Sequence, residues 1–206
     1  MNIQSENLKK YIIDNLNIKD ENNIKQEEIN QLKKININRL NLNLKEASFN
    51  PQELLYLKKL EIISFNMFFI SDEIMANLEK LELLKILELD FCRNISKNKS
   101  NIRIEKMYLN HSDFSFIEIL KNKVHLKKLY LENLEEVDIN KICECERMEE
   151  LNLLNCRVIN SMNLNKLLNL KKVKIIGSTL DNTDIIEILK SKIKVTYLTK
   201  KYYNVG

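Results

Sequence analysis

The chain has 206 residues, of which 44% are hydrophobic and 30% charged, a balance typical of a folded protein with a buried core. Its formal net charge of +4, from 33 basic and 29 acidic side chains, is too small to indicate a nucleic-acid or membrane partner by itself. Only two glycines and one proline are present, which leaves little material for flexible linkers, so we expect one continuous domain over residues 1–206.

The N-terminal segment predicts two short amphipathic helices. Leu8, Ile12, Ile13 and Leu16 group on one helical face, which suits a helical cap over residues 1–34. Residues 1–10 contain no apolar stretch of the length that a signal peptide needs, so we expect a cytoplasmic location. The longest apolar stretch, 62–70, is far shorter than the roughly 20 residues that span a bilayer, and no membrane contact is expected.

A repeated motif occupies the rest of the chain. The pattern L-x-x-L-x-L recurs with its middle apolar residue at eight positions: Leu40, Leu60, Leu87, Met107, Leu129, Leu151, Val173 and Val195. The last five positions are 22 residues apart, which chance placement of apolar residues rarely produces. The first three copies are looser, with intervals of 20, 27 and 20 residues.

Each copy predicts a short strand followed by a return segment. Apolar and polar residues alternate with the period of a strand, and the strands must be parallel because every copy has the same direction. The return segments carry helix-start signals at Asn50-Pro51, at Ser115 with Glu118 and at Asp184 with Glu187, and a longer helix is expected after Ser71-Asp72 as far as 84. Because one such unit cannot bury its apolar edge alone, successive units should stack around one core.

This combination of motif and period resembles the leucine-rich-repeat family over about residues 35–199. The resemblance implies an α/β leucine-rich-repeat solenoid of about eight repeats of about 22 residues, with a curved parallel β-sheet on the concave face and short helices or 3₁₀ turns on the convex face. The N-terminal helices are similar to the cap of internalin-like bacterial proteins, and residues 200–206 would close the last repeat. In the family, an Asn or Cys bonds the backbone at the turn after each strand. That place holds Cys92, Ser112, Leu134, Cys156 and Ser178, of which Leu134 departs from the pattern.

In this family the concave sheet is the usual binding surface, and the residues that flank each inward leucine should face it. For the first two copies these are Arg39, Asn41, Asn43, Lys59, Glu61 and Ile63. From the later copies we predict protein contacts through Tyr108, Tyr130, Glu88, Asp90, Glu132, Asn110, Asn152, Leu154 and Ile176. Tyrosine beside charged residues is a common composition of binding hot spots. The alternative is that these are ordinary surface residues.

A basic stripe offers a second hypothesis. Six strands carry a basic residue at one position: Arg39, Lys59, Lys106, Lys128, Lys172 and Lys194. Such a row could follow phosphates, as in a phage-encoded anti-CRISPR-type inhibitor that binds an RNA-guided effector or its nucleic acid. Ile86 and Glu150 interrupt the row, which favours a solvated strand surface. The loop 93–103 adds a basic cluster that we expect beside the stripe. Met67-Phe68-Phe69 is a third candidate patch, for which a core position beneath the long helix is the favoured interpretation.

The sequence contains no pattern typical of catalysis. It has no glycine-rich phosphate loop, and its two histidines, His111 and His125, show no metal-ligand spacing. Of the four cysteines, only Cys143 and Cys145 are close, as C-x-C, and reduced, partly buried thiols are expected. We therefore predict a non-enzymatic inhibitor or adaptor without a cofactor or metal, whose partner is another protein.

Overall fold

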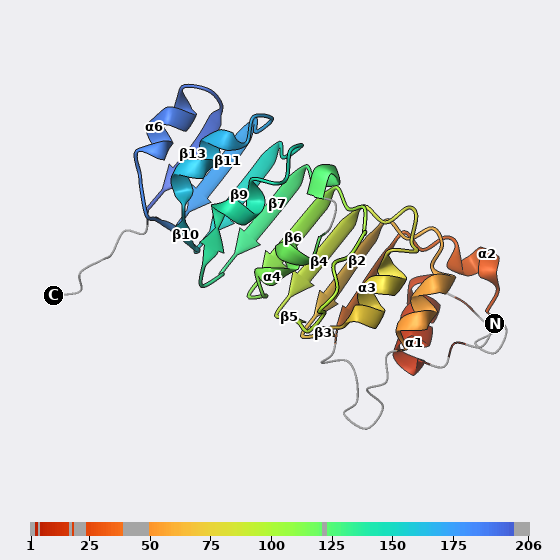
Figure 1. The fold of residues 1–206 in the computed structure, drawn as a ribbon. Coiled ribbons are helices and arrows are strands. Elements are labelled where there is room, and N and C mark those ends of the chain that lie inside the picture. The colour runs from red at the N-terminus through yellow and green to blue at the C-terminus, as the bar shows by residue number, and fades with distance from the viewer. Residues whose placement is uncertain are drawn as a thin grey trace.

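A computed structural model of the protein describes residues 3, 5–16, 18, 24–38, 50–120 and 123–199. One sheet of eight parallel strands runs along the molecule (Figure 1). Its strands, in spatial order, are β1 (Lys34–Asn38), β2 (Ile62–Asn66), β4 (Ile86–Asp90), β6 (Lys106–Asn110), β7 (Lys128–Glu132), β9 (Glu150–Leu154), β11 (Lys172–Ile176) and β13 (Lys194–Leu198). The strand order follows the chain order, which confirms the predicted α/β solenoid.

Short helices cover one face of this sheet (Figure 1). The α-helices are α1 (Glu6–Leu16), α2 (Gln26–Ile29), α3 (Asp72–Leu78), α4 (Ser115–Ile119), α5 (Ile139–Ile142) and α6 (Ile185–Lys190). The 3₁₀ helices are η2 (Pro51–Tyr56), η3 (Lys123–His125) and η4 (Ser161–Lys166). Small strands β3 (Phe69–Ile70) and β5 (Arg93–Asn94) pair together, and β8 (Val137–Asp138), β10 (Arg157–Ile159) and β12 (Thr179–Leu180) form a second small sheet. The helix-covered side is the convex face, and the opposite face of the long sheet is the concave face.

The core is a continuous column of apolar side chains between the two faces. Each strand contributes its second and fourth residues, as in Leu129 and Leu131 of β7 and Leu151 and Leu153 of β9, all with no exposed surface. The corresponding positions of β6 and β7 pair in register, so each unit buries its leucines against the next.

The register of the first two strands differs from the prediction. In the parallel pairing, Ile35 of β1 lies beside Ile63 of β2, and Ile63 lies beside Leu87 of β4. The inward residues are therefore Ile35 and Ile63 rather than Leu40, which lies outside the described residues, and Leu60, which is buried just before β2. The segment 57–65 fits the motif in two frames, and only pairing with β4 selects one.

The helix starts are partly as predicted. The Asn50 side chain accepts a hydrogen bond from a backbone amide at the start of η2, and Ser71 does so for α3. Helix α4 begins at Ser115 and α6 begins directly after Asp184, as the helix-start signals predict, but neither side chain makes a capping hydrogen bond. The residues preceding α4 and α6 have helical backbone angles, whereas a side-chain cap requires an extended residue there. Helix α3 also ends at Leu78 instead of continuing to 84.

Candidate binding surface

The concave face carries three rows of side chains, one from each of the first, third and fifth residues of every strand. All nine residues predicted to contact a protein lie in these rows: Tyr108, Tyr130, Glu88, Asp90, Glu132, Asn110, Asn152, Leu154 and Ile176. They come from five adjacent strands, β4 to β11, which places them on one contiguous surface. From β6 onward this arrangement follows from the constant 22-residue period, because equal spacing puts equivalent residues side by side. The pairing of β4 with β6 adds Glu88 and Asp90 across a step of 20 residues.

Two tyrosines form the centre of this surface. The rings of Tyr108 and Tyr130 stack with centroids 4.3 Å apart and an interplanar angle of 14°. The Lys106 Nζ lies 5.5 Å and 5.7 Å from the two ring centroids, within the range of a cation–π contact. Burial, together with the nearby Glu150 carboxylate, raises the pKa of Tyr130 to about 12. The phenol stays protonated at neutral pH and donates a hydrogen bond to the Glu150 carboxylate.

The acidic residues beside the tyrosines are held in place by hydrogen bonds. The Asp90 carboxylate accepts from the side-chain amides of Asn66 at 3.0 Å and Asn110 at 2.7 Å. Further hydrogen bonds between side-chain amides connect Asn133 to Asn110 at 2.9 Å and Asn155 to Asn133 at 3.2 Å. This chain of side chains crosses five units along one edge of the sheet, and it orders that edge before any partner binds.

Glu88 of the same strand is held by residues of β2 and β1. Its carboxylate accepts a hydrogen bond from the Ser64 hydroxyl and lies 3.5 Å from the Lys34 Nζ. Glu132, in contrast, has no ion pair among the described residues. Of the three carboxylates predicted to contact a protein, Glu88, Asp90 and Glu132, that of Glu132 is thus the one open to a cationic partner.

Asn152 has an unsatisfied polar group on the concave face. It is 7% exposed and pairs in register with Tyr130 and Lys174. Its side-chain Oδ1 is buried without a hydrogen-bond partner in the described part of the chain. A buried acceptor without a donor carries a free-energy cost of about 1–3 kcal/mol.

An apolar row follows the tyrosines toward the C-terminal strands. Leu154 and Ile176 are half-buried, and Leu198 is 57% exposed, at equivalent positions of adjacent strands. The concave face therefore changes along its length, from carboxylates through aromatic rings to aliphatic side chains. Contact of this kind with a protein removes apolar area from water.

The basic stripe is shorter than the sequence predicts. Lys106, Lys128, Lys172 and Lys194 do share the first position of their strands. Arg39 lies outside the described residues, and Lys59 lies in the turn before β2, so its placement on the sheet was wrong.

Two other concave-face placements in the same segment were also wrong. Glu61 precedes β2, and Ile63 points into the core with no exposed surface, because β2 starts at Ile62.

An acidic residue neutralises part of the stripe. The Glu150 carboxylate lies 2.8 Å from the Lys172 Nζ and 3.6 Å from the Lys128 Nζ. The hydrogen bond from Lys172 lowers the pKa of Glu150, which keeps it charged. Two of the four aligned lysines are thus engaged by a carboxylate within the row, and this weakens the phosphate-binding interpretation.

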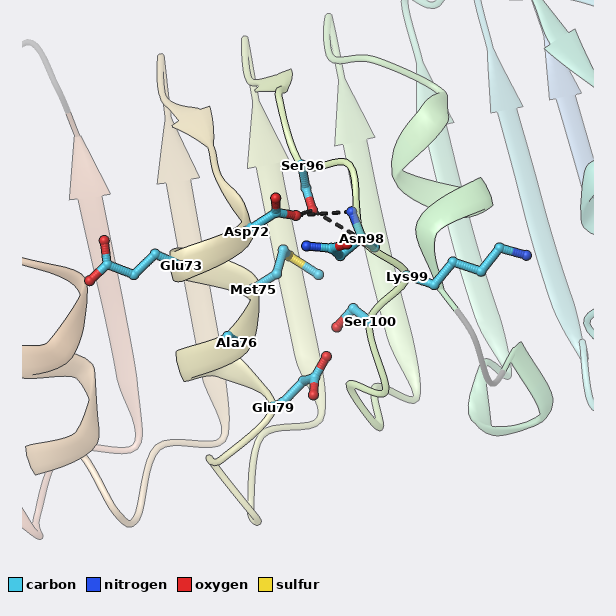
Figure 2. A pocket seen from close by; sticks show the side chains of 9 residues that line it. All are labelled: Asp72, Glu73, Met75, Ala76, Glu79, Ser96, Asn98, Lys99 and Ser100. Carbon is cyan, nitrogen blue, oxygen red and sulfur yellow. Dashed lines mark hydrogen bonds between the residues drawn. The ribbon is translucent and has the colours of Figure 1, made fainter.

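The basic loop 93–103 lies over the convex face, so the expectation that it lies beside the stripe was wrong. Asp72 of α3 accepts hydrogen bonds from the Ser96 hydroxyl and from the amides of Lys97 and Asn98, both at 3.0 Å. Figure 2 shows Asp72 turned toward Ser96 and Asn98. These residues line a hollow of about 310 Å³. The bonds lower the pKa of Asp72. Because its carboxylate is occupied in holding the loop, we assign this hollow a structural role.

Comparisons with known proteins agree with this geometry. No protein-family model matches the sequence, and no curated protein sequence matches it. The structure is similar to that of an internalin (inlF) from Listeria monocytogenes, with a TM-score of 0.60 and 17% identity over 94% of this chain and 55% of that one. The chain thus spans little more than half the length of that protein. It is also similar to an internalin C2 (inlC2) from the same species, with a TM-score of 0.57 and 15% identity over 93% and 92% of the two chains.

This chain has the leucine-rich-repeat fold. In the leucine-rich-repeat turns, Cys and Ser bond the backbone as the family pattern implies: the Ser112 hydroxyl accepts from the Cys92 amide at 2.9 Å and donates to the Leu89 carbonyl at 3.1 Å. Leu134 makes no such bond, yet the preceding Asn133 has a φ of 54°, within the narrow range of the other turns. Stacking against neighbouring units therefore preserves the turn geometry that the sequence left open.

The turn residues themselves form a row that sequence reasoning missed. Met67, Phe91 and His111 follow β2, β4 and β6 with φ values of 59°, 50° and 46°. Phe91 stacks on His111 with centroids 4.4 Å apart and is 46% exposed. Aligning the repeats could have shown large residues where later units have Asn or Gly.

Phe68 is buried as expected, but Met67 and Phe69 are 36% and 52% exposed, so the core prediction was wrong for them.

The remaining chemistry of the leucine-rich-repeat chain concerns its thiols. Burial raises the pKa of Cys92 to about 11 and that of Cys145 to about 12, so both stay as unreactive thiols at neutral pH. Cys143 is only half-buried, while Cys145 is fully buried.

Across the described ranges, no three His, Cys, Asp or Glu residues gather as metal ligands. Within those ranges, too, no helix has the length and apolar character to cross a membrane.

Proposed function

We propose that this protein is a non-enzymatic binding module, an inhibitor or adaptor, that recognises a protein partner through its concave face. The leucine-rich-repeat fold supports the general role, because its extended sheet is a rigid surface that loses little conformational entropy on binding. The chain's own residues support the particular surface.

The observation that carries the proposal is the stacked pair of Tyr108 and Tyr130 at the centre of the concave face. The pair is preorganised at 4.3 Å, is flanked by Lys106, and stands between carboxylates and an aliphatic row. Interface hot spots are enriched in tyrosine and lie in the middle of a surface that excludes water.

The test uses the immobilised protein to retain partners from the cell that produces it, with mass spectrometry as the readout. Tyr108→Ala with Tyr130→Ala should lose the partner that the unmodified protein retains. Tyr56→Ala is the matched control, because Tyr56 lies in η2, away from the concave sheet. Circular dichroism of all variants establishes that they are folded.

Once a partner is identified, each tyrosine variant should weaken its affinity by about 30-fold, the size of a hot-spot contribution of about 2 kcal/mol. Retention that is equal for the tyrosine variants and the unmodified protein would refute a role for the concave face. Loss of the partner in the Tyr56 control as well would point to a stability effect and would equally count against the proposal.

A second candidate function is the anti-CRISPR-type inhibitor that binds an RNA-guided effector or its nucleic acid. It depends on the aligned Lys106, Lys128, Lys172 and Lys194, whose common row supports phosphate contact. The pairing of Glu150 with two of these lysines argues against it. A steep fall in affinity with salt, or ribonucleic acid that copurifies with the chain and is lost on Lys106→Gln, would favour this candidate over the protein-binding one.

A further inference from the structure

A pocket of about 460 Å³ lies at the edge of the solenoid where β4, β6 and β7 end. The residues that matter for its chemistry are Phe91, His111, Asn133, Arg93, Asp113 and Glu135. The turn residues among them directly follow concave-face residues of the three strands, so the pocket is continuous with the concave face. None of the residues proposed above as concave contacts lines it.

One wall of the pocket is formed by two stacked aromatic rings. The rings of Phe91 and His111 are nearly parallel, with an interplanar angle of 6° and centroids 4.4 Å apart. Both residues hold a left-handed backbone conformation, which costs a residue with a side chain about 1–2 kcal/mol. The equivalent residues of later units are Asn155 and Gly177, which adopt it readily. The aromatic rings are thus displayed at a position where the backbone alone favours small residues.

The carboxylates of Asp113, Glu135 and Glu136 and the guanidinium of Arg93 line the pocket, so its formal charge is negative. Asp113 pairs with Arg93 at 3.3 Å, and Glu136 pairs with Arg157 at 3.1 Å. The exposed Glu135 has no ion pair in the described part of the chain. Among the carboxylates that line the pocket, that of Glu135 therefore remains without a cation.

We propose that this pocket binds an arginine side chain of the protein partner. A guanidinium group is planar and cationic, so it can pack along the wall formed by Phe91 and His111 and donate paired hydrogen bonds to the Glu135 carboxylate. An aliphatic side chain would leave the carboxylate unpaired, and an acidic one would be repelled by it. The inference rests on the proposed function, because the arginine would belong to a protein partner that binds the concave face and extends a segment over this edge.

The experiment titrates the ¹⁵N-labelled protein with the peptide acetyl-Gly-Arg-Gly-amide and follows amide chemical shifts. Saturable shifts are expected at His111, Asn133 and Glu135. The same peptide with citrulline, which is neutral and of nearly the same shape, should bind about tenfold more weakly, because it keeps the planar group and loses the charge. Equal binding of the two peptides, or shifts that do not centre on these residues, would overturn the proposal.

Variants make the test specific. Phe91→Asn replaces the ring with the residue that other turns use, so this variant should fold. Glu135→Gln removes only the charge of the carboxylate. Each variant should lower the affinity for the arginine peptide about fivefold or more. Glu118→Gln, which removes a similarly exposed carboxylate from α4, should leave binding unchanged. Unchanged binding in both pocket variants would dismiss the site.

The outcome is separable from that of the proposed function. Tyr108→Ala with Tyr130→Ala should not affect the arginine peptide, since neither residue lines the pocket. Failure of the peptide titration therefore leaves the concave-face proposal standing, and failure of the tyrosine test leaves the peptide result intact.

Discussion

The turns of the N-terminal units and those of the C-terminal units have the same backbone but different residues. Met67, Phe91 and His111 hold φ values of 46° to 59°, and Asn155 and Gly177 hold 52° and 61°. The residue type therefore does not set this conformation. Each turn amide donates to the carbonyl that ends the next strand, as Met67 does to Asp90 at 2.9 Å and Gly177 to Leu198 at 2.8 Å. Stacking imposes the turn, and residues that conform at a cost indicate another use for their side chains.

The largest expected effect tests whether the two regions share one core. Leu87 of β4 and Leu131 of β7 are 1% and 0% exposed. Replacing either by alanine should lower the free energy of unfolding by about 2–5 kcal/mol, because both leave a cavity in the same apolar column. Urea denaturation followed by circular dichroism measures the change. Leu168→Ala is the control, since Leu168 is 89% exposed. A loss of unfolding free energy at Leu87 less than half of that at Leu131 would show that the units before the constant 22-residue period are packed separately.

A smaller effect tests the turn comparison itself. Gly177→Ala should destabilise the protein by about 1 kcal/mol, because alanine is disfavoured at a φ of 61°. Met67→Gly should stabilise the protein by about 0.5 kcal/mol. Glycine removes the conformational free-energy cost of a φ of 59°, and this gain exceeds the cost of the greater entropy of the unfolded chain. Thermal unfolding of both variants would measure opposite shifts. Destabilisation by Met67→Gly would mean that the partly exposed methionine contributes more by packing than it costs in conformation.

The smallest effect is local and depends on pH. Both regions hold a loop with one carboxylate: Asp72 accepts from the amides of Lys97 and Asn98, and Asp181 accepts from those of Asn160 and Ser161. Hydrogen bonds lower the pKa of both groups below the usual 3.8. The stabilisation is therefore present above pH 3.8 and is lost as the pH falls through each lowered pKa.

Hydrogen exchange checks this prediction. Protection factors of the four amides should fall on acidification, and Asp72→Asn and Asp181→Asn should each lower them at neutral pH in its own loop only. Protection that persists in the asparagine variants would show that the loops are held by packing, and that the carboxylates are incidental.

Sequence alone determined the solenoid, its parallel sheet and the concave positions from Leu87 onward. A strict period explains this success, because equal spacing forces equivalent residues such as Tyr108 and Tyr130 into neighbouring places. Only the tertiary structure decided the frame of β1 and β2, since residues 57–65 satisfy the motif in two ways and the pairing of Ile63 with Leu87 selects one. It also decided the convex position of the basic loop, the open carboxylate of Glu135 and the exposed Phe91 ring. These depend on which neighbour supplies a hydrogen bond, an ion pair or cover, and a repeat motif carries no information about that.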